Sequence, residues 1–513
     1  MTSTVAEHAF VSPFEKVFYS DELVSQYEPL ALSWEAVVET EGKDKVALAE
    51  YEKYLKKYRT FDTCSNWDGK VYDIVFYGVS GYTGYLMMEY LKRVALKVTP
   101  ESFTFAFAGR TVRKVEEMRD REFAGTQWAD TPVLMMSYDD PVSIIDLVRS
   151  ARVIVNVAGP YMATQGELLV DLCIDLGVSY VDISGEIPWS LRIMELHKKA
   201  VEAGVIVVPS AASAGGFPDL ATYLCAQKMR EEYGEELRTA ICYCSGGGTD
   251  VTASGGTLKT RSVMASAGDE VRAKMGDPFA LGGFIPERDR WGVKGCSIEF
   301  GTGKTKLKSR SEDLDANMAK ISEDKKLGVW RGPHIYSYFD TRVVRRSNML
   351  MADLANRPYG ANLNFLEFSM LPTDAVLAAA QIGSRGAGRA QKVSVEDEKQ
   401  ALQAKGAYYK EGEGPQLEEL EDAWTGYFVW AETANGHEVK CSFVGRDGYM
   451  ETARVAIETA MCLLFDKLPF KGGVLTPTVA CGECLLRRMV AGNLRFQMGE
   501  WFPTEERRPP PWP

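Results

Sequence analysis

The sequence predicts an α/β fold, in which a doubly wound parallel sheet is followed by a second domain of the α+β class. Three observations lead to this prediction. The chain has 513 residues, which is more than one hydrophobic core usually serves. From Lys70 onward, short apolar runs alternate with helical stretches. Three glycines then separate the first apolar run from the first helical stretch.

Six apolar runs are the expected strands of the sheet, and five helical stretches lie between them. Parallel neighbours need crossover connections, and strands buried on both faces show little alternation of apolar and polar residues. The order therefore predicts a Rossmann sheet with helices on both faces. The runs are VYDIVFYG, SFTFAFAG, PVLMMSY, RVIVNVAG, VSYVDISG and GVIVVPSA.

The pattern divides the chain into five parts. We expect a partly helical N-terminal arm over residues 1–69 and the Rossmann domain over residues 70–214. The alternation then gives way to glycine-rich loops, so we expect residues 215–450 to form an α+β domain for substrate binding or dimerisation. We expect a C-terminal helical segment over residues 451–500, whose return to the Rossmann domain stays open, and a flexible proline-rich tail over residues 501–513.

The stretch GVSGYTGYLMMEYL joins the first apolar run to the first helix. In a doubly wound sheet this turn carries the phosphate site, because a helix N-terminus offers unpaired N–H groups and a partial positive charge. The glycines permit a tight turn, close approach of the backbone to a diphosphate, and close packing of helix on strand. Their spacing is G-x-x-G-x-x-G, and a tight turn without a ligand is the alternative. The predicted cofactor-binding residues here are Gly78, Ser80, Gly81, Tyr82, Thr83 and Gly84.

The end of the second apolar run favours NADP(H) over NAD(H). An acidic residue at this point would bind the ribose 2′-hydroxyl and repel a 2′-phosphate, whereas an arginine would do the opposite. The sequence reads FAFAGRTVRK, which has no carboxylate at the strand end. We therefore predict that the Rossmann domain binds NADP(H) through Arg110. Arg113 and Lys114 also fit a solvated helix face.

The fourth apolar run ends in a loop, NVAGPYMATQG, that leaves the ligand-binding edge of the sheet. The proline fixes a chain direction that would line the cofactor rather than continue a helix. We therefore predict that this loop contributes four further cofactor-binding residues: Asn156, Ala158, Gly159 and Pro160.

The predicted catalytic residues lie at the same edge. Hydride transfer to an activated double bond needs a donor for the enolate oxygen and a proton for the α carbon. Tyr161 is the first candidate donor, and Asp182 or Ser184, at the end of the fifth run, are the candidate orienting groups. Packing of Tyr161 under the nicotinamide, and helix capping by Ser184 or Glu186, are the alternatives.

Composition excludes several other classes of function. The formal net charge of -12 repels phosphate backbones, so nucleic acid is not an expected partner. Cys242 with Cys244, and Cys481 with Cys484, form short-spaced pairs without a histidine nearby in the sequence, so no metal site is predicted. The amino terminus lacks the order of a signal peptide, so we expect a cytoplasmic protein with reduced thiols.

Taken together, the motifs resemble the saccharopine dehydrogenase-like oxidoreductases, a family that includes the trans-acting enoyl reductases. The resemblance extends from about Tyr72 to Gln497, and its most specific part runs from GPY to DISGE. The matching stretches are GVSGYTGYLMMEYL, AGRTVRKVE, VIVNVAGPYMATQGELLVDLCIDLGVSYVDISGE, SGGTLKT, VVRRSNML, GEGPQLEELEDAWTGYFV, GYMETARVAIETAMCL and GGVLTPTVACGECLLRR.

The resemblance implies an NAD(P)H-dependent oxidoreductase that reduces a small-molecule enoyl, acyl or polyketide-type lipid substrate by hydride transfer. One alternative is a dehydrogenase of an amino-acid conjugate, in which Arg345 and Arg346 would hold carboxylates. Another is a non-catalytic NADP(H)-binding protein that contacts lipid droplets or membranes through the apolar residues 365–382. A homodimer stays open.

Overall fold

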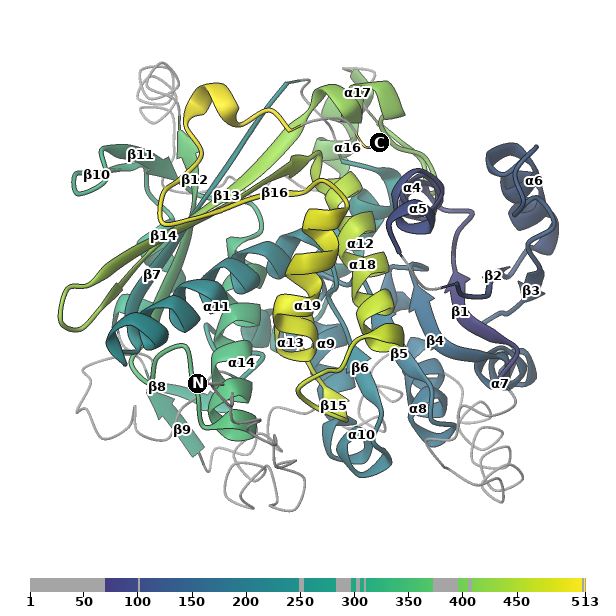
Figure 1. Ribbon diagram of the computed structural model, residues 1–513, viewed down its shortest axis with the longest axis horizontal. Coiled ribbons are helices and arrows are strands. Elements are labelled where there is room, and N and C mark those ends of the chain that lie inside the picture. The colour runs from purple at the N-terminus through teal and green to yellow at the C-terminus, as the bar shows by residue number, and fades with distance from the viewer. Residues whose placement is uncertain are drawn as a thin grey trace, which may run out of the picture.

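The computed structural model describes residues 70–99, 102–248, 253–282, 297–300, 305–308, 311–371, 395–404, 408–509 and 512 (Figure 1). The arm predicted over residues 1–69 lies outside the described residues. The described chain forms two seven-stranded sheets and one two-stranded sheet. Within the described residues, no helix has the length and apolar character needed to cross a membrane.

The first sheet is parallel throughout, which confirms the predicted Rossmann fold. Its strand order is β15-β6-β5-β4-β1-β2-β3, and each of the six predicted apolar runs contributes one strand. In register, Ile74 lies between Phe105 and Val153. The strands are β1 (Tyr72–Tyr77), β2 (Phe105–Gly109), β3 (Val133–Met135), β4 (Ala151–Asn156), β5 (Ser179–Asp182), β6 (Ile206–Val208) and β15 (Gly473–Val474).

Helices cover both faces of this sheet because its strands are apolar on both sides. One face packs on α4, α6, α18 and α19, and the other packs on α7, α8, α9 and α10. The helices of the first domain are α4 (Tyr82–Tyr90), the π turn η3 (Leu91–Ala95), α5 (Leu96–Val98), α6 (Val112–Glu122), α7 (Pro141–Ser150), η4 (Tyr161–Ala163), α8 (Gly166–Asp175), α9 (Ile187–Met194) and α10 (His197–Ala203).

The C-terminal segment contributes directly to the first sheet. Strand β15 pairs in parallel with β6, and His197 accepts a hydrogen bond at Nδ1 from the Val474 amide at 3.1 Å. Burial lowers the pKa of His197 to about 3, so this imidazole is neutral. Helices α18 (Gly448–Phe465) and α19 (Pro477–Ala491) lie beside β5 and β6 in Figure 1. The start of α18 thereby reaches the ligand-binding edge.

The second sheet is mixed, with the order β10-β11-β12-β7-β13-β14-β16. The central pair β12 and β7 is parallel, and the other pairs are antiparallel. The strands are β7 (Leu237–Gly247), β10 (Ser322–Asp324), β11 (Val329–Gly332), β12 (Asn364–Leu371), β13 (Trp424–Thr433), β14 (Glu438–Arg446) and β16 (Arg495–Met498), and the separate two-stranded sheet is β8 (Ser297–Phe300) with β9 (Thr305–Lys308).

Helices α11 (Ser213–Tyr233) and α14 (Ser337–Ala355) cover the inner face of the second sheet. Residues of α11 and α18 belong to one hydrophobic cluster that includes residues of both sheets. The two sheets therefore share a core. The remaining helices are α12 (Gly255–Ala265), α13 (Asp269–Met275), η6 (Ser311–Asp313), η7 (Asp315–Met318), α16 (Val395–Ala404), α17 (Leu417–Asp422) and η8 (Thr504–Glu506).

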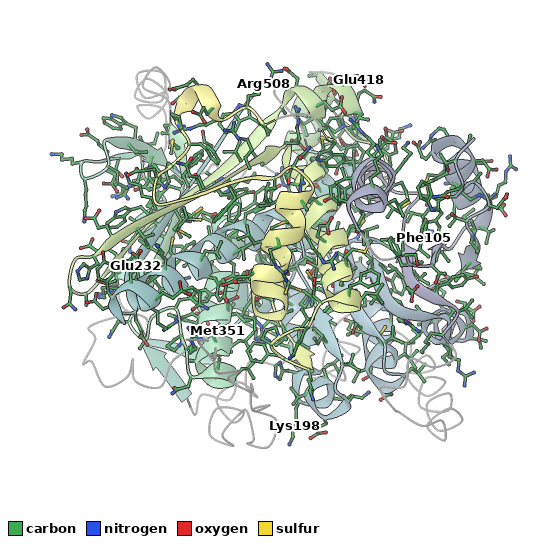
Figure 2. All side chains as sticks on the ribbon, viewed as in Figure 1. Phe105, Lys198, Glu232, Met351, Glu418 and Arg508 are labelled. Carbon is green, nitrogen blue, oxygen red and sulfur yellow. The ribbon has the colours of Figure 1, made fainter. Side chains whose placement is uncertain are left out.

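Two predictions about surface segments need correction. The described part of the predicted flexible tail is packed: Trp512 is 2% exposed and lies edge-on to Tyr90, with ring centroids 5.0 Å apart. Arg508 forms an ion pair with Asp422 of α17, and Figure 2 shows Arg508 at the same edge of the molecule as Glu418. Residues 365–371, the first part of the predicted lipid-contacting stretch, lie in the interior strand β12, and residues 372–382 lie outside the described residues.

Candidate functional site

The site begins at the turn between β1 and α4. The Gly78 amide donates to the Ala108 carbonyl at 3.0 Å, and Gly78 has φ +90°, a conformation that favours glycine. A Cβ atom on Gly78 would lie 2.8 Å from the amide nitrogen of Ala158. The turn after β1 therefore packs directly against the loop after β4, and a side chain on Gly78 would separate them.

Gly81 and Gly84 leave the start of α4 bare. Gly81 is the N-cap residue of α4, no side chain caps the helix, and its first turn holds no acidic residue. A Cβ atom on Gly84 would collide with the Val79 backbone, so this glycine lets the helix lie close to the turn. The result is a helix N-terminus with a partial positive charge and no capping side chain.

The other predicted residues of this turn differ in exposure. Ser80 is exposed and Thr83 is half-buried, so both can face a ligand at the helix start. The Tyr82 side chain is directed elsewhere: its hydroxyl donates to the Pro415 carbonyl at 2.9 Å, and its ring lies edge-on to Tyr449 at 5.4 Å. Tyr82 can therefore contribute its backbone amide to a ligand, while its side chain joins the two domains.

Arg110 follows β2 directly and is exposed. It lies near Tyr77 at the end of β1. Burial raises the pKa of the Tyr77 phenol to about 12, and the charge of Arg110 acts to lower it. Arg113 points away into solvent and pairs with Glu117 one helical turn on, at 2.8 Å. Of the basic residues after β2, Arg110 is thus beside the glycine turn and Arg113 lies on a solvated helix face.

The loop after β4 is held from within. The Asn156 amide donates to the hydroxyls of Tyr138 and Tyr180, each at 2.9 Å, and its oxygen accepts from the Ala158 amide at 3.0 Å. The side chain of Asn156 is therefore a support of the loop. Ala158, Gly159 and Pro160, the next predicted residues, are half-buried, exposed and half-buried, and lie beside the glycine turn through Ala158.

The Tyr161 hydroxyl, the first candidate donor, is hydrogen-bonded within the protein. It donates to the Asn156 carbonyl at 2.8 Å and accepts from the Ile183 amide at 3.3 Å, so it ties the end of β4 to the end of β5. The residue is 3% exposed, and its ring packs on Trp189. Burial raises the pKa of this phenol well above its usual range. A hydroxyl that is buried and used in this way is not placed to protonate a substrate.

Asp182 and Ser184, the predicted orienting groups, are also bonded within the protein. Asp182 is fully buried, and its Oδ1 accepts from the Ser184 hydroxyl at 2.6 Å, the Ser184 amide at 2.9 Å and the Ser210 amide at 3.0 Å. Its Oδ2 accepts from the indole nitrogen of Trp189 at 2.8 Å. Four donors thus occupy the carboxylate, which joins β5, α9 and the loop after β6.

Glu186 holds the backbone of the same loop. Its carboxylate accepts from the amides of Tyr161 and Met162, at 2.9 and 2.8 Å, and makes no side-chain cap of α9. Burial raises the pKa of Glu186 to about 7, while the two amides lower it. Glu186 therefore holds η4 in place, and helix capping, one of the alternatives left open for it, is not observed.

Several residues at the junction of the two domains were not predicted. The Tyr449 hydroxyl accepts from the Ser254 amide at 2.8 Å and lies 2.9 Å from the Thr257 hydroxyl, which joins α18 to α12. The Ser213 hydroxyl donates to the Gly448 carbonyl at 2.9 Å. The stretches SGGTLKT and GYMETARV carry four of these five residues, but no local pattern shows that they meet.

Tyr336 and Tyr338, at the start of α14, lie at the same junction and are half-buried. Burial raises the pKa of Tyr336 to about 12, Tyr449 raises it further, and Arg261 opposes the shift through its charge and a hydrogen bond. Tyr338 lies close enough to Glu186 to be influenced by its charge. These phenols are therefore near both the second domain's α12 and the first domain's edge.

Arg345 and Arg346 do not form a carboxylate site. Both are buried, whereas the alternative of an amino-acid-conjugate dehydrogenase needs them open to a substrate's carboxylates. Arg345 donates to the Pro278 carbonyl at 2.9 Å, and Arg346 donates to the Val474 carbonyl at 2.8 Å. The two guanidinium groups are thus used to hold backbone segments together.

The residues of the β1–α4 turn fit the diphosphate of a dinucleotide. A side chain at Gly78 or Gly84 would fill space that the backbone uses, and the start of α4 has neither a capping side chain nor an acidic residue. The turn also lies at the ligand-binding edge of a parallel Rossmann sheet. Fold and turn together define the class of protein: a Rossmann-type dinucleotide-binding protein.

Sequence relatives agree with this class. The chain is 27% identical over 429 residues to a trans-acting enoyl reductase of Mycobacterium tuberculosis, which covers 82% of this chain and 95% of the relative. It is 27% identical over 431 residues to a trans-acting enoyl reductase of Mycobacterium ulcerans, with the same coverage. No protein-family model matches the chain. The chain is therefore homologous over most of its length to the trans-acting enoyl reductases, which confirms the resemblance seen in the sequence.

Two solved structures match most of the chain at low sequence identity. Apo saccharopine dehydrogenase from Saccharomyces cerevisiae superposes with a TM-score of 0.42 at 14% identity, covering 83% of this chain and 99% of that one. The homospermidine synthase of Legionella pneumophila in complex with NAD superposes with a TM-score of 0.46 at 11% identity, covering 85% and 93%.

Proposed function

We propose that the protein is an NADP(H)-dependent reductase of an enoyl thioester or a related polyketide-type lipid substrate. The observation that carries this proposal is the bare N-terminus of α4, which opens at the edge of the sheet where the second domain brings in Tyr449 and Tyr336. The homologues named trans-acting enoyl reductases support the choice of substrate class.

The nicotinamide supplies the hydride when it is bound. The protein's own residues then have two tasks on the cofactor side. The first turn of α4 would bind the diphosphate through its N–H groups. Arg110 is exposed beside the glycine turn, and no carboxylate lies at the end of β2. Arg110 would therefore bind the 2′-phosphate of NADP(H).

On the substrate side, the protein must stabilise negative charge on the carbonyl oxygen of the acyl group. We assign the role of hydrogen-bond donor to Tyr336 rather than to Tyr161. Tyr336 is half-buried at the domain junction, and Arg261 lies beside its hydroxyl. A phenol next to a guanidinium group can donate a hydrogen bond to an oxyanion without losing its own proton. Tyr336 is thus the proposed donor to the enolate oxygen.

The proposal is tested by following NADPH oxidation with a panel of enoyl thioesters of different chain length. The Tyr336→Phe variant is expected to lower kcat about 100-fold while NADPH affinity is unchanged. Tyr338→Phe is a matched control, because it removes a neighbouring phenol from the same helix start. Tight NADPH binding without oxidation by any enoyl thioester would contradict the proposed reaction.

Cofactor choice is tested separately. Replacing Arg110 by alanine is expected to weaken NADPH binding about 10- to 30-fold and to leave NADH binding nearly unchanged, because one charge-assisted contact to the 2′-phosphate is lost. Arg113→Ala is the matched control, since this exposed arginine pairs with Glu117. Equal affinities of the wild-type protein for NADPH and NADH, measured by fluorescence titration, would contradict the NADP(H) assignment.

A further inference from the structure

A group of thiol, carboxylate and imidazole side chains lies on the inner face of the second sheet, away from the nucleotide turn. We call it the thiol–carboxylate cluster, and it consists of Cys242, Cys244, His334, Asp340 and Glu367. Cys242 and Cys244 are on β7, and Glu367 is on the neighbouring strand β12, in register with Cys242. Asp340 is in the first turn of α14, which covers this face.

The separations within the cluster are those of ligands around one ion. The two thiol sulfurs are 4.0 Å apart, and the Cys244 sulfur lies 3.3 Å from Oε1 of Glu367. Ligand atoms around a tetrahedral zinc ion are separated by about 3.3 to 3.8 Å, given bond lengths of about 2.0 to 2.3 Å. The candidate ligand atoms of Cys242, Cys244 and Glu367 all lie within 4.8 Å of one another.

Glu367 also belongs to a second such group. Its carboxylate, that of Asp340 and the imidazole of His334 have ligand atoms within 4.8 Å of one another. His334 Nδ1 lies 3.2 Å from the Ser369 hydroxyl, so one ring nitrogen already has a polar neighbour that can fix the ring. The two groups share Glu367, which makes it the central candidate ligand.

Three of the four oxygens of the two carboxylates have no hydrogen-bond partner among the described residues. Asp340 and Glu367 are fully buried, and neither oxygen of Asp340 nor Oε2 of Glu367 has a hydrogen-bond partner among the described residues. The buried carboxylate of Asp182, by contrast, accepts hydrogen bonds from four donors. Unpaired buried carboxylates are unfavourable unless a cation or a proton neutralises them.

We propose that the thiol–carboxylate cluster is a zinc site, with Cys242, Cys244 and Glu367 as ligands and the fourth ligand supplied by Asp340 or His334. Two sulfurs together with oxygen or nitrogen ligands suit Zn²⁺ better than Mg²⁺ or Ca²⁺, which prefer oxygen alone. Binding releases the two thiol protons to solvent and leaves both cysteines as thiolates.

The site would have a structural role next to the proposed substrate region. Asp340 lies four residues after Tyr336, the residue at the start of α14 that we propose as the oxyanion donor. An ion that holds β7, β12 and the start of α14 together would fix the position of this helix start. The zinc proposal does not depend on the proposed reaction, since metal content is measured without substrate.

The first test is the metal content of the full-length protein, purified from cells grown with added zinc and dialysed at length. We expect about one zinc per chain, falling below about one-tenth in the double variant Cys242→Ser with Cys244→Ser. Cys462→Ser with Cys481→Ser is the matched control, because these two cysteines are also buried and adjacent. The control is expected to keep its zinc.

A second measurement covers the case in which the cysteine variant does not fold. Metal-free wild-type protein is titrated with Co²⁺, and a thiolate-to-cobalt charge-transfer band is expected that saturates at about one equivalent. Glu367→Gln, which preserves size, is expected to weaken Co²⁺ binding at least tenfold. Asp340→Asn and His334→Gln identify the fourth ligand by which of them weakens binding.

The proposal is overturned by two results. One is a wild-type protein with less than about one-tenth zinc per chain and no thiolate band with Co²⁺, which would mean that protons alone neutralise the cluster. The other is a folded Cys242→Ser, Cys244→Ser variant that binds as much metal as the wild-type protein.

Discussion

Two loops at the same edge of the first sheet differ in how their polar groups are used. In the turn between β1 and α4, the backbone is bare and no side chain caps the helix. In the loops after β4 and β5, by contrast, Tyr161, Asp182 and Glu186 are buried and bonded to neighbouring backbone or side-chain groups.

This difference in the use of polar groups distinguishes an element that can bind a ligand from the loops that support it. A ligand is bound by donors that the protein itself leaves unsatisfied, which is the state of the α4 start. A buried carboxylate that accepts four hydrogen bonds has no capacity left for a ligand. The loops after β4 and β5 therefore fix the position of the edge, and the glycine turn is the proposed site of dinucleotide binding.

The largest expected effect comes from placing a charge in the glycine turn. Gly81→Asp would put a carboxylate at the N-terminus of α4, where it would cap the helix and repel a diphosphate. We expect NADPH affinity, measured by calorimetry, to fall about a thousandfold, or about 4 kcal/mol, with little change in thermal stability.

The control for this variant is Gly268→Asp, because Gly268 is also a helix N-cap residue, at the start of α13, with open space around it. It should bind NADPH as the wild-type protein does. An undiminished affinity in Gly81→Asp would remove the distinction between the two loops.

The next largest effect is expected in the supporting region. Asp182→Asn would place an amide donor against either the Trp189 indole or the donors from Ser184 and Ser210. We expect the free energy of unfolding to fall by about 3 kcal/mol, since a buried charged acceptor is lost and a buried donor is left facing another donor. Denaturant unfolding followed by tryptophan fluorescence measures it, and a variant as stable as the wild-type protein would contradict the supporting role.

Glu186 gives the supporting region a pH dependence. Its pKa is raised from 4.5 to about 7 in the folded protein, mainly by burial. The folded state therefore holds this proton more tightly than the unfolded chain does. The contribution of Glu186 to the free energy of unfolding is thus greatest below about pH 4.5 and falls as the pH rises through 7. We expect this residue to contribute a loss of about 2 to 3 kcal/mol over that range.

The comparison with Glu186→Gln isolates this contribution, because Asp219 and other buried carboxyl groups remain unchanged in the variant. The loss between pH 4.5 and 7 should be smaller in the variant by the amount above. Parallel stability profiles of the two proteins would show that Glu186 titrates normally.

The sequence predicted the features that depend on residues close to one another along the chain. The six strands β1 to β6 were predicted because each carries its own apolar run, and the glycine turn because strand, glycines and helix are consecutive. Strand β15 has only two residues, Gly473 and Val474, which is too short for any periodicity to show. Its place in the first sheet comes from pairing with β6, far away in the sequence.

The contacts of the predicted catalytic residues could not be predicted, for the same reason. Asp182 reads as a carboxylate at a ligand-binding edge, and the donor from Ser210, which lies 28 residues further on, cannot be inferred locally. The thiol–carboxylate cluster was missed because Glu367 is 123 residues from Cys244. Residue type and position at the edge were therefore predictable, whereas the satisfaction of each polar group depended on contacts between distant segments.

The smallest expected effect is the most direct test of the two regions. Tyr161→Phe removes a hydroxyl that donates to the Asn156 carbonyl and accepts from the Ile183 amide. We expect a loss of about 1 kcal/mol in the free energy of unfolding, with kcat unchanged in an enoyl thioester assay. If Tyr161 were instead the proton donor, its removal would lower kcat by about 100-fold or more. A large loss of kcat with unchanged stability would move the catalytic function back to the loop after β4, whereas a small loss of stability alone identifies Tyr161 as a link between β4 and β5.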